Sequence, residues 1–125
     1  MSKFDRGELE SAIPVIESMI SRSVNVQGKL KEESSQASLT KNRLKALNLS
    51  LALIHRELKE DYDMEKPTED DLKNALPPII STIGKCTKIE LKSKEGTSQA
   101  TLTRNMLKAL YLSSSLITAE LDKRQ

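Results

Sequence analysis

Few side chains in this sequence could carry out catalysis. The chain holds one histidine, His55, and one cysteine, Cys86, and no local motif supplies either with a partner. A catalytic histidine needs a second group within hydrogen-bonding reach, and a zinc site needs about four ligands. A di-iron site in a helical bundle needs a glutamate one helical turn before the histidine, where this chain has Ala52. We therefore expect no enzyme, no metal and no cofactor, with Cys86 in a structural role and His55 as an ordinary surface or boundary residue.

Sites for nucleotides and flat ligands also lack their usual residues. The four glycines are isolated, so no glycine-rich phosphate loop or dinucleotide fingerprint is present. Two tyrosines, one phenylalanine and no tryptophan leave little surface on which bases could stack. The composition, 37% hydrophobic and 30% charged, instead suits long amphipathic helices with solvated outer faces.

Basic residues gather in two segments. Residues 28–45 hold five Lys or Arg and two Glu, and residues 84–108 hold six and two. Such clusters can bind phosphate, a nucleic-acid backbone or an acidic protein surface. A simpler interpretation, which the interspersed glutamates favour, is that exposed turns are often rich in lysine. The candidate anion or partner contacts are Lys29, Lys31, Lys41, Lys92, Lys94 and Arg104.

The elements that carry these residues come from an internal repeat. Residues 35–59 and 98–122 are identical at sixteen of 25 positions, at an offset of 63. The same offset continues upstream without a gap and relates, for example, Leu9 to Leu72. So many matches in one register indicate the duplication of a single unit. Two copies of one unit are suited to pack on each other about a pseudo-twofold axis, as the subunits of a dimer do.

Each copy contains two helical patterns. Apolar residues recur three and four positions apart, which predicts helices at about 6–27, 35–60, 69–93 and 98–122. Pro14 and Pro77 fall inside the first and third of these helices. Proline removes a backbone hydrogen bond in a helix interior, so each helix is expected to bend or break there.

Helix starts carry recognisable capping residues. Two starts have a capping-box pair, Asp5 with Glu8 and Thr68 with Asp71. Serine is a favourable N-cap, and the expected caps of the second and fourth helices are Ser35 and Ser98.

Short connections favour antiparallel neighbours, so we predict an all-α, four-helix antiparallel bundle with up-down-up-down topology. It forms a single domain, 1–125, from repeats at about 5–62 and 68–125 joined by a linker at 61–67. Both hairpin connections then lie at one end, which brings the six candidate cations together. The acidic residues expected at the other end are Glu60, Asp61, Asp63, Glu65, Glu69, Asp70 and Asp71.

Some polar positions are the same in both copies and lie off the main apolar line. They include Asn42 with Asn105, and Lys45 with Lys108. A solvated helix face is the simpler interpretation, and a mirrored partner-binding surface is the alternative.

The expected function is a non-enzymatic protein-interaction or regulatory module with an unidentified protein partner. The alternative is nucleic-acid binding to the phosphate backbone through the basic hairpin end. No run of apolar residues is long enough to span a membrane, and the polar N-terminus is unlike a secretory signal, so a cytoplasmic location is the default. Both a monomer and a homodimer are compatible with the pattern.

Overall fold

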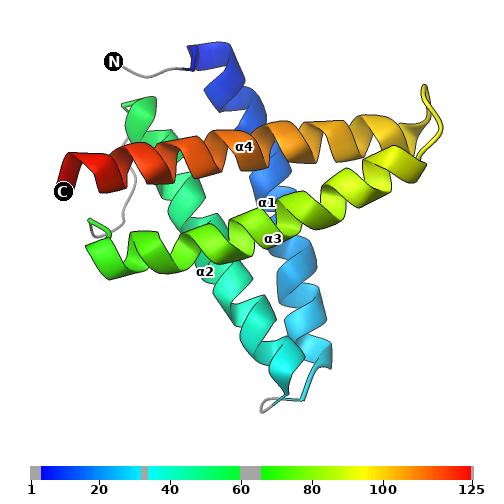
Figure 1. The fold of residues 1–125 in the computed structure, drawn as a ribbon, viewed down its shortest axis with the longest axis horizontal. Coiled ribbons are helices and arrows are strands. Elements are labelled where there is room, and N and C mark those ends of the chain that lie inside the picture. Colours follow the sequence, from blue (N-terminus) through cyan, green and yellow to red (C-terminus); the bar gives the residue numbers. More distant parts are fainter. Residues whose placement is uncertain (1–3, 32–33, 60–65, 125) are drawn as a thin grey trace.

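The computed structural model describes residues 4–31, 34–59 and 66–124, and all regular structure in these segments is helical (Figure 1). The helices are α1 (Arg6–Lys29), α2 (Ser35–Glu57), α3 (Glu69–Lys92) and α4 (Ser98–Arg124). The four predicted helices are confirmed, with each end within three residues of its predicted position. In this part of the chain, none of the helices combines the length and apolar character needed to cross a membrane.

Both predicted capping boxes form. At the start of α1 the Glu8 amide donates to Asp5 Oδ1 at 2.7 Å. At the start of α3 the Asp71 amide donates to Thr68 Oγ1 at 3.0 Å. In each box the third helical residue also accepts a hydrogen bond from the backbone amide of the cap residue. Two amides that have no partner within the helix are therefore satisfied at each start.

The predicted serine caps of α2 and α4 are wrong by one residue. Ser34 caps α2, where its hydroxyl accepts from the Ala37 amide at 3.1 Å. Thr97 accepts in the same way from the Ala100 amide at 3.2 Å at the start of α4. Each start offers two adjacent residues that are good caps, so composition alone could not choose between them.

The interior prolines do not break their helices. Helix α1 continues through Pro14, and α3 continues through Pro77 and Pro78. Pro14 and Pro77 are exposed, so water can reach the backbone carbonyl that each proline leaves without an amide donor.

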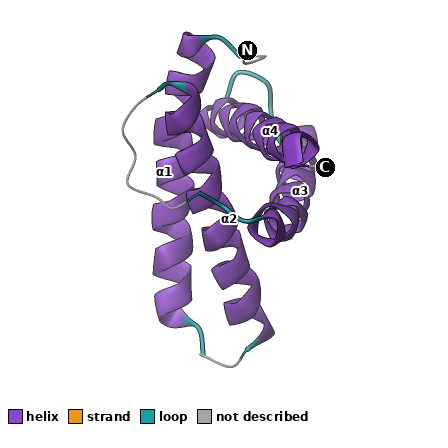
Figure 2. Ribbon diagram, turned by 90° about the vertical axis from the view of Figure 1, so that its left-hand side faces the viewer, coloured by secondary structure: helices purple, strands orange, loops and turns teal. Residues whose placement is uncertain are grey.

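The helices form two hairpins, α1 with α2 and α3 with α4, which lie across each other (Figure 1). In Figure 1 the first hairpin runs down the picture and the second runs across it. Figure 2, turned by 90°, confirms the crossing, because α3 and α4 are seen almost end-on while α1 and α2 still run vertically.

The two hairpin connections therefore lie far from each other. The connection after α1 is at the foot of Figure 1, and the connection after α3 is at its right-hand edge. The prediction that both connections share one basic end is wrong. Apolar periodicity specifies which face of a helix is buried, but helices can pack at several crossing angles. Of the predicted acidic end, residues 60–65 lie outside the described residues, and Glu69, Asp70 and Asp71 form the exposed first turn of α3.

Helices α2 and α4 form the centre of the core. They contact each other and both outer helices, whereas no Cα atom of α1 lies within 8 Å of a Cα atom of α3 in the described segments. Leu47 and Ile54 of α2, and Leu110 and Ile117 of α4, are at most 1% exposed. Full burial of such a side chain stabilises the fold by about 1.5–3 kcal/mol.

Buried serines lie among these large apolar residues. Ser50 of α2 and Ser113 of α4 are fully buried, and they occupy equivalent positions in the two copies. Their hydroxyls donate to the carbonyls of Ala46 and Ala109, each at 2.8 Å. Each hydroxyl is thus satisfied within its own helix, and the small side chains leave room for a neighbouring helix to pack closely.

Candidate partner-binding groove

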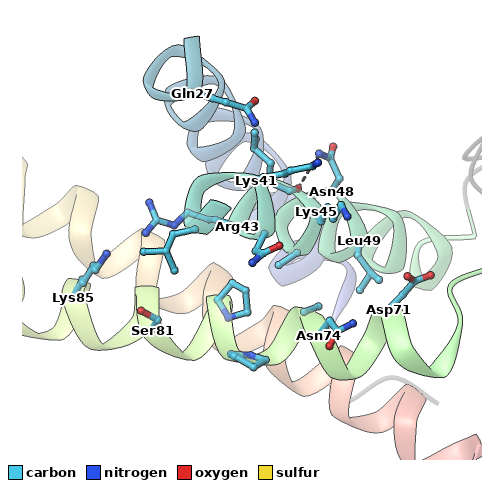
Figure 3. Close-up of a pocket in the computed structure, with 17 residues that line it drawn as sticks. Gln27, Lys41, Arg43, Lys45, Asn48, Leu49, Asp71, Asn74, Ser81 and Lys85 are labelled. Carbon is cyan, nitrogen blue, oxygen red and sulfur yellow. Dashed lines mark hydrogen bonds between the residues drawn. The ribbon is translucent and has the colours of Figure 1, made fainter. Parts of the chain in front are cut away.

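An open groove of about 930 Å³ lies between α2 and α3, with Gln27 of α1 at its margin (Figure 3). One wall is formed by the stretch Leu39–Leu49 of α2, and the other by the stretch Asp71–Lys85 of α3. These two walls come from different copies of the repeat. The crossing of the hairpins therefore brings together residues that are well separated in the sequence.

Four cations line the groove: Lys41, Arg43 and Lys45 of α2, and Lys85 of α3. Lys41 and Lys45 are one helical turn apart, so they lie on the same side of α2. None of the four forms an ion pair within 4.0 Å with another described residue. With the single carboxylate, Asp71, the groove carries four positive charges and one negative charge, a net +3.

Asp71 lies at the opposite end of the groove from Lys85 in Figure 3. The Thr68 backbone amide donates to Asp71 Oδ2 at 3.0 Å, and hydrogen bonding to Thr68 holds the pKa of this carboxyl below its usual value. The charge of Lys45 lowers the pKa in the same direction, to a smaller extent. The carboxylate is therefore ionised at neutral pH and already serves as a capping acceptor.

Apolar side chains and two prolines lie among the cations. Leu39, Leu44 and Leu49 contribute from α2, and Pro77 and Pro78 contribute from α3. Leu39 is 60% exposed, so its side chain is available for an apolar contact. Asn42, Asn48, Asn74 and Ser81 add uncharged hydrogen-bonding groups to the same surface. The groove thus combines an apolar lining with unpaired positive charge.

Cys86 lies next to this region on α3 and is 3% exposed. Burial raises the pKa of its thiol, and the nearby Arg43 and Arg22 oppose this rise only in part. A thiol in this state is a poor nucleophile. This burial is compatible with the structural role that the sequence predicts for Cys86. His55, near the end of α2, is half-buried.

The six cations predicted as contacts do not form one cluster. Lys41 lines the groove, while Arg104 is exposed on α4. Lys29 and Lys31 flank the connection after α1. Lys92 and Lys94 border a shallow hollow of about 420 Å³ at the other hairpin connection. The structure therefore separates these residues into distinct sites.

Sequence reasoning missed Arg43 and Lys85 as groove residues. Asn42 and Lys45 were noted as positions shared between the copies, and both line the groove. The identity of these positions in the two copies could have indicated a functional surface, although their place off the apolar line favoured a solvated helix face. Lys85 falls within the basic segment 84–108, but the sequence does not place it opposite Lys45, because the two meet only through the crossing of the two hairpins.

Among the described residues, no group of three or more His, Cys, Asp or Glu side chains is placed to hold a metal ion. Comparison of the chain with protein families, with curated proteins and with solved structures gives no match.

Proposed function

We propose that this protein is a non-enzymatic interaction module that binds an acidic, partly apolar segment of a partner protein in the α2–α3 groove. The main support is the groove lining, in which Lys41, Arg43, Lys45 and Lys85 occur together with the exposed side chains of Leu39 and Pro77. Carboxylates of a partner would meet the unpaired cations, and its apolar side chains would cover the leucines and prolines.

The apolar lining favours a protein partner over a nucleic acid. A phosphate backbone needs an array of cations and gains little from leucine and proline side chains. A binding site for single strands also uses aromatic side chains to stack bases, and the residues lining this groove include none.

The alternative function is binding of a nucleic-acid backbone through the basic residues of the hairpin connections. The exposed Lys29, Lys31, Lys92 and Lys94 support it, but they occupy two connections that point in different directions (Figure 1). A single strand or duplex would have to reach both connections to use all four charges.

We also propose that the two hairpins are antiparallel units related by a pseudo-twofold axis, with a bend at Pro14 and at Pro77. The support is that burial repeats at the offset of 63, as in the fully buried pairs Ile54 with Ile117 and Ser50 with Ser113. In this arrangement α1 corresponds to α3, and the central α2 corresponds to α4. Such a relation would make the chain resemble a dimer of hairpins.

A direct test is fluorescence anisotropy with a labelled short peptide of alternating acidic and leucine residues. The wild-type protein is expected to bind it, and Lys45→Glu combined with Lys85→Glu is expected to weaken binding at least about tenfold, because both substitutions reverse charges in the groove. Lys92→Glu with Lys94→Glu is the matched control, with the same charge change at a hairpin connection.

The control variant is expected to bind the peptide with nearly wild-type affinity. If the control loses binding and the groove variant keeps it, the groove proposal is wrong. A labelled oligonucleotide, titrated at low and near-physiological salt, tests the alternative. Oligonucleotide binding that exceeds peptide binding and falls steeply with salt would favour the nucleic-acid function.

A further inference from the structure

We infer that the chain carries a second, weaker binding site for the same kind of acidic segment, on the face where α4 meets α1. This inference rests on the proposed function of the α2–α3 groove. It makes the protein a bivalent module that can hold two segments of a partner at once. The two sites would be built from equivalent residues of the two repeats.

The basic residues of the groove recur at the offset of 63. Lys41 corresponds to Arg104, and Lys45 corresponds to Lys108. On the other wall, the counterpart of Lys85 is Arg22. These three counterparts are exposed, and Asn105, the counterpart of Asn42, is exposed as well. Three of the four groove cations therefore have a basic counterpart in the other repeat.

The helices that carry these counterparts are in contact. Helix α4 contacts α1, and helix α2 contacts α3. Figure 1 shows α4 passing across α1. The acidic end also recurs, because Glu8 and Asp71 each occupy the third position of a capping box. The exposed Pro14 takes the place of the exposed Pro77 on this face.

The cations on this second face are as available as those of the groove. Arg22 donates to the Ser18 hydroxyl at 3.2 Å, a neutral partner that leaves its charge uncompensated. Neither Arg104 nor Lys108 forms an ion pair within 4.0 Å with a residue in the described segments. Leu102, the counterpart of Leu39, is 45% exposed, so an apolar contact is also offered.

Differences between the copies make the second site weaker. Met106 stands where the groove has Arg43, and Glu90 stands where it has Gln27. Three cations and two carboxylates give this face a net charge of +1, compared with +3 for the groove. Tyr111, which is 55% exposed, replaces Asn48 and adds apolar area. Binding there should depend less on salt, because fewer charges contribute.

Native mass spectrometry with the same acidic–leucine peptide counts the bound peptides, and calorimetry measures their affinities. The wild-type protein is expected to bind two peptides, the second roughly 5–20-fold more weakly because of its smaller charge. Lys45→Glu is expected to remove the tighter event, and Lys108→Glu the weaker one. Both side chains are exposed, and circular dichroism checks that each variant is folded.

A reciprocal pair of substitutions gives a second readout. Met106→Arg should tighten the weaker event several-fold, and Arg43→Met should weaken the tighter one by a similar factor. One bound peptide in the wild type, with no effect of Lys108→Glu or Met106→Arg, would overturn the second site. The proposed function would still stand if Lys45→Glu abolished that one event. Two events that are both insensitive to Lys45→Glu would instead contradict the proposed function.

Discussion

Arg56 of α2 and Glu120 of α4 form an ion pair between the two hairpins, with Nη2 and Oε2 2.5 Å apart. The Glu120 side chain is 7% exposed and the Arg56 side chain is 44% exposed. The pair therefore links the two central helices at the edge of the core. A second cation, Lys123, lies farther from Glu120, with its Nζ 4.0 Å from the same Oε2 atom.

Arg56→Ala should lower the free energy of unfolding by about 1–2 kcal/mol, because it removes the guanidinium that balances the charge of the buried Glu120 carboxylate. The loss stays below that of a fully buried pair, since water reaches the arginine. Urea unfolding followed by circular dichroism measures it. Arg6→Ala is the control, because its ion pair with Glu10 is exposed on both sides, and it should cost at most about 0.5 kcal/mol. If the two variants lost the same free energy of unfolding, the burial of Glu120 would add nothing to the strength of its ion pair.

The buried serines should tolerate a smaller residue but no larger one. Ser50→Ala and Ser113→Ala should each change stability by less than about 1 kcal/mol, because the hydroxyls bond only within their own helices. Ser50→Leu and Ser113→Leu should each cost about 1–3 kcal/mol through overpacking. Thermal unfolding of the four variants tests this. A leucine variant as stable as wild type would mean that the helices do not pack closely at that serine.

How far the sequence predicts this structure differs between local and long-range features. The spacing of apolar residues three and four positions apart predicted the helices, and the pairing of Thr68 with Asp71 predicted a capping box, because both patterns depend on interactions within one helix. The crossing of the hairpins was not predicted, since the apolar stripe does not specify a packing angle. Lys45 and Lys85 lie on different repeats and come together only through that crossing. The count of charges puts each of them in a basic segment, but it could not place them on opposite walls of one groove.

The capping carboxylate of α3 makes stability depend on acid pH. Hydrogen bonding to Thr68, with a smaller contribution from Lys45, lowers the pKa of Asp71 in the folded protein. The unfolded protein then binds the proton more tightly, so this group stabilises the fold above its unfolded pKa. The stabilisation is lost as the pH falls through the lower, folded pKa.

Thr68→Ala should raise the pKa of Asp71 toward its usual value, although the backbone amide of residue 68 still donates to the carboxylate. An NMR titration of the Asp71 carboxyl carbon in both proteins measures the change. Thr87→Ala serves as a control elsewhere on α3, where the hydroxyl donates to the Ile83 carbonyl. An Asp71 pKa that is the same in the wild type and in Thr68→Ala would contradict the role of this cap.

The buried thiol should react slowly while the protein is folded. Burial of Cys86 raises the pKa of the thiol and excludes reagents from it. Labelling with a chromogenic disulfide at mildly alkaline pH should be at least about a hundredfold slower in native protein than in urea, because access requires local unfolding. Rapid labelling of the native protein would mean that the neighbourhood of Cys86 opens readily.

An acidic, partly apolar segment bound in the proposed α2–α3 site should perturb the backbone amides of both groove walls. The most direct measurement is an amide chemical-shift map, recorded while the acidic–leucine peptide is added to isotope-labelled protein at low salt. The largest shifts are predicted in residues 39–49 of α2 and 71–85 of α3, with smaller shifts on the face of α1 and α4. Shifts confined to the hairpin connections around Lys29 and Lys94, or no shifts under peptide excess, would contradict the groove as the binding site.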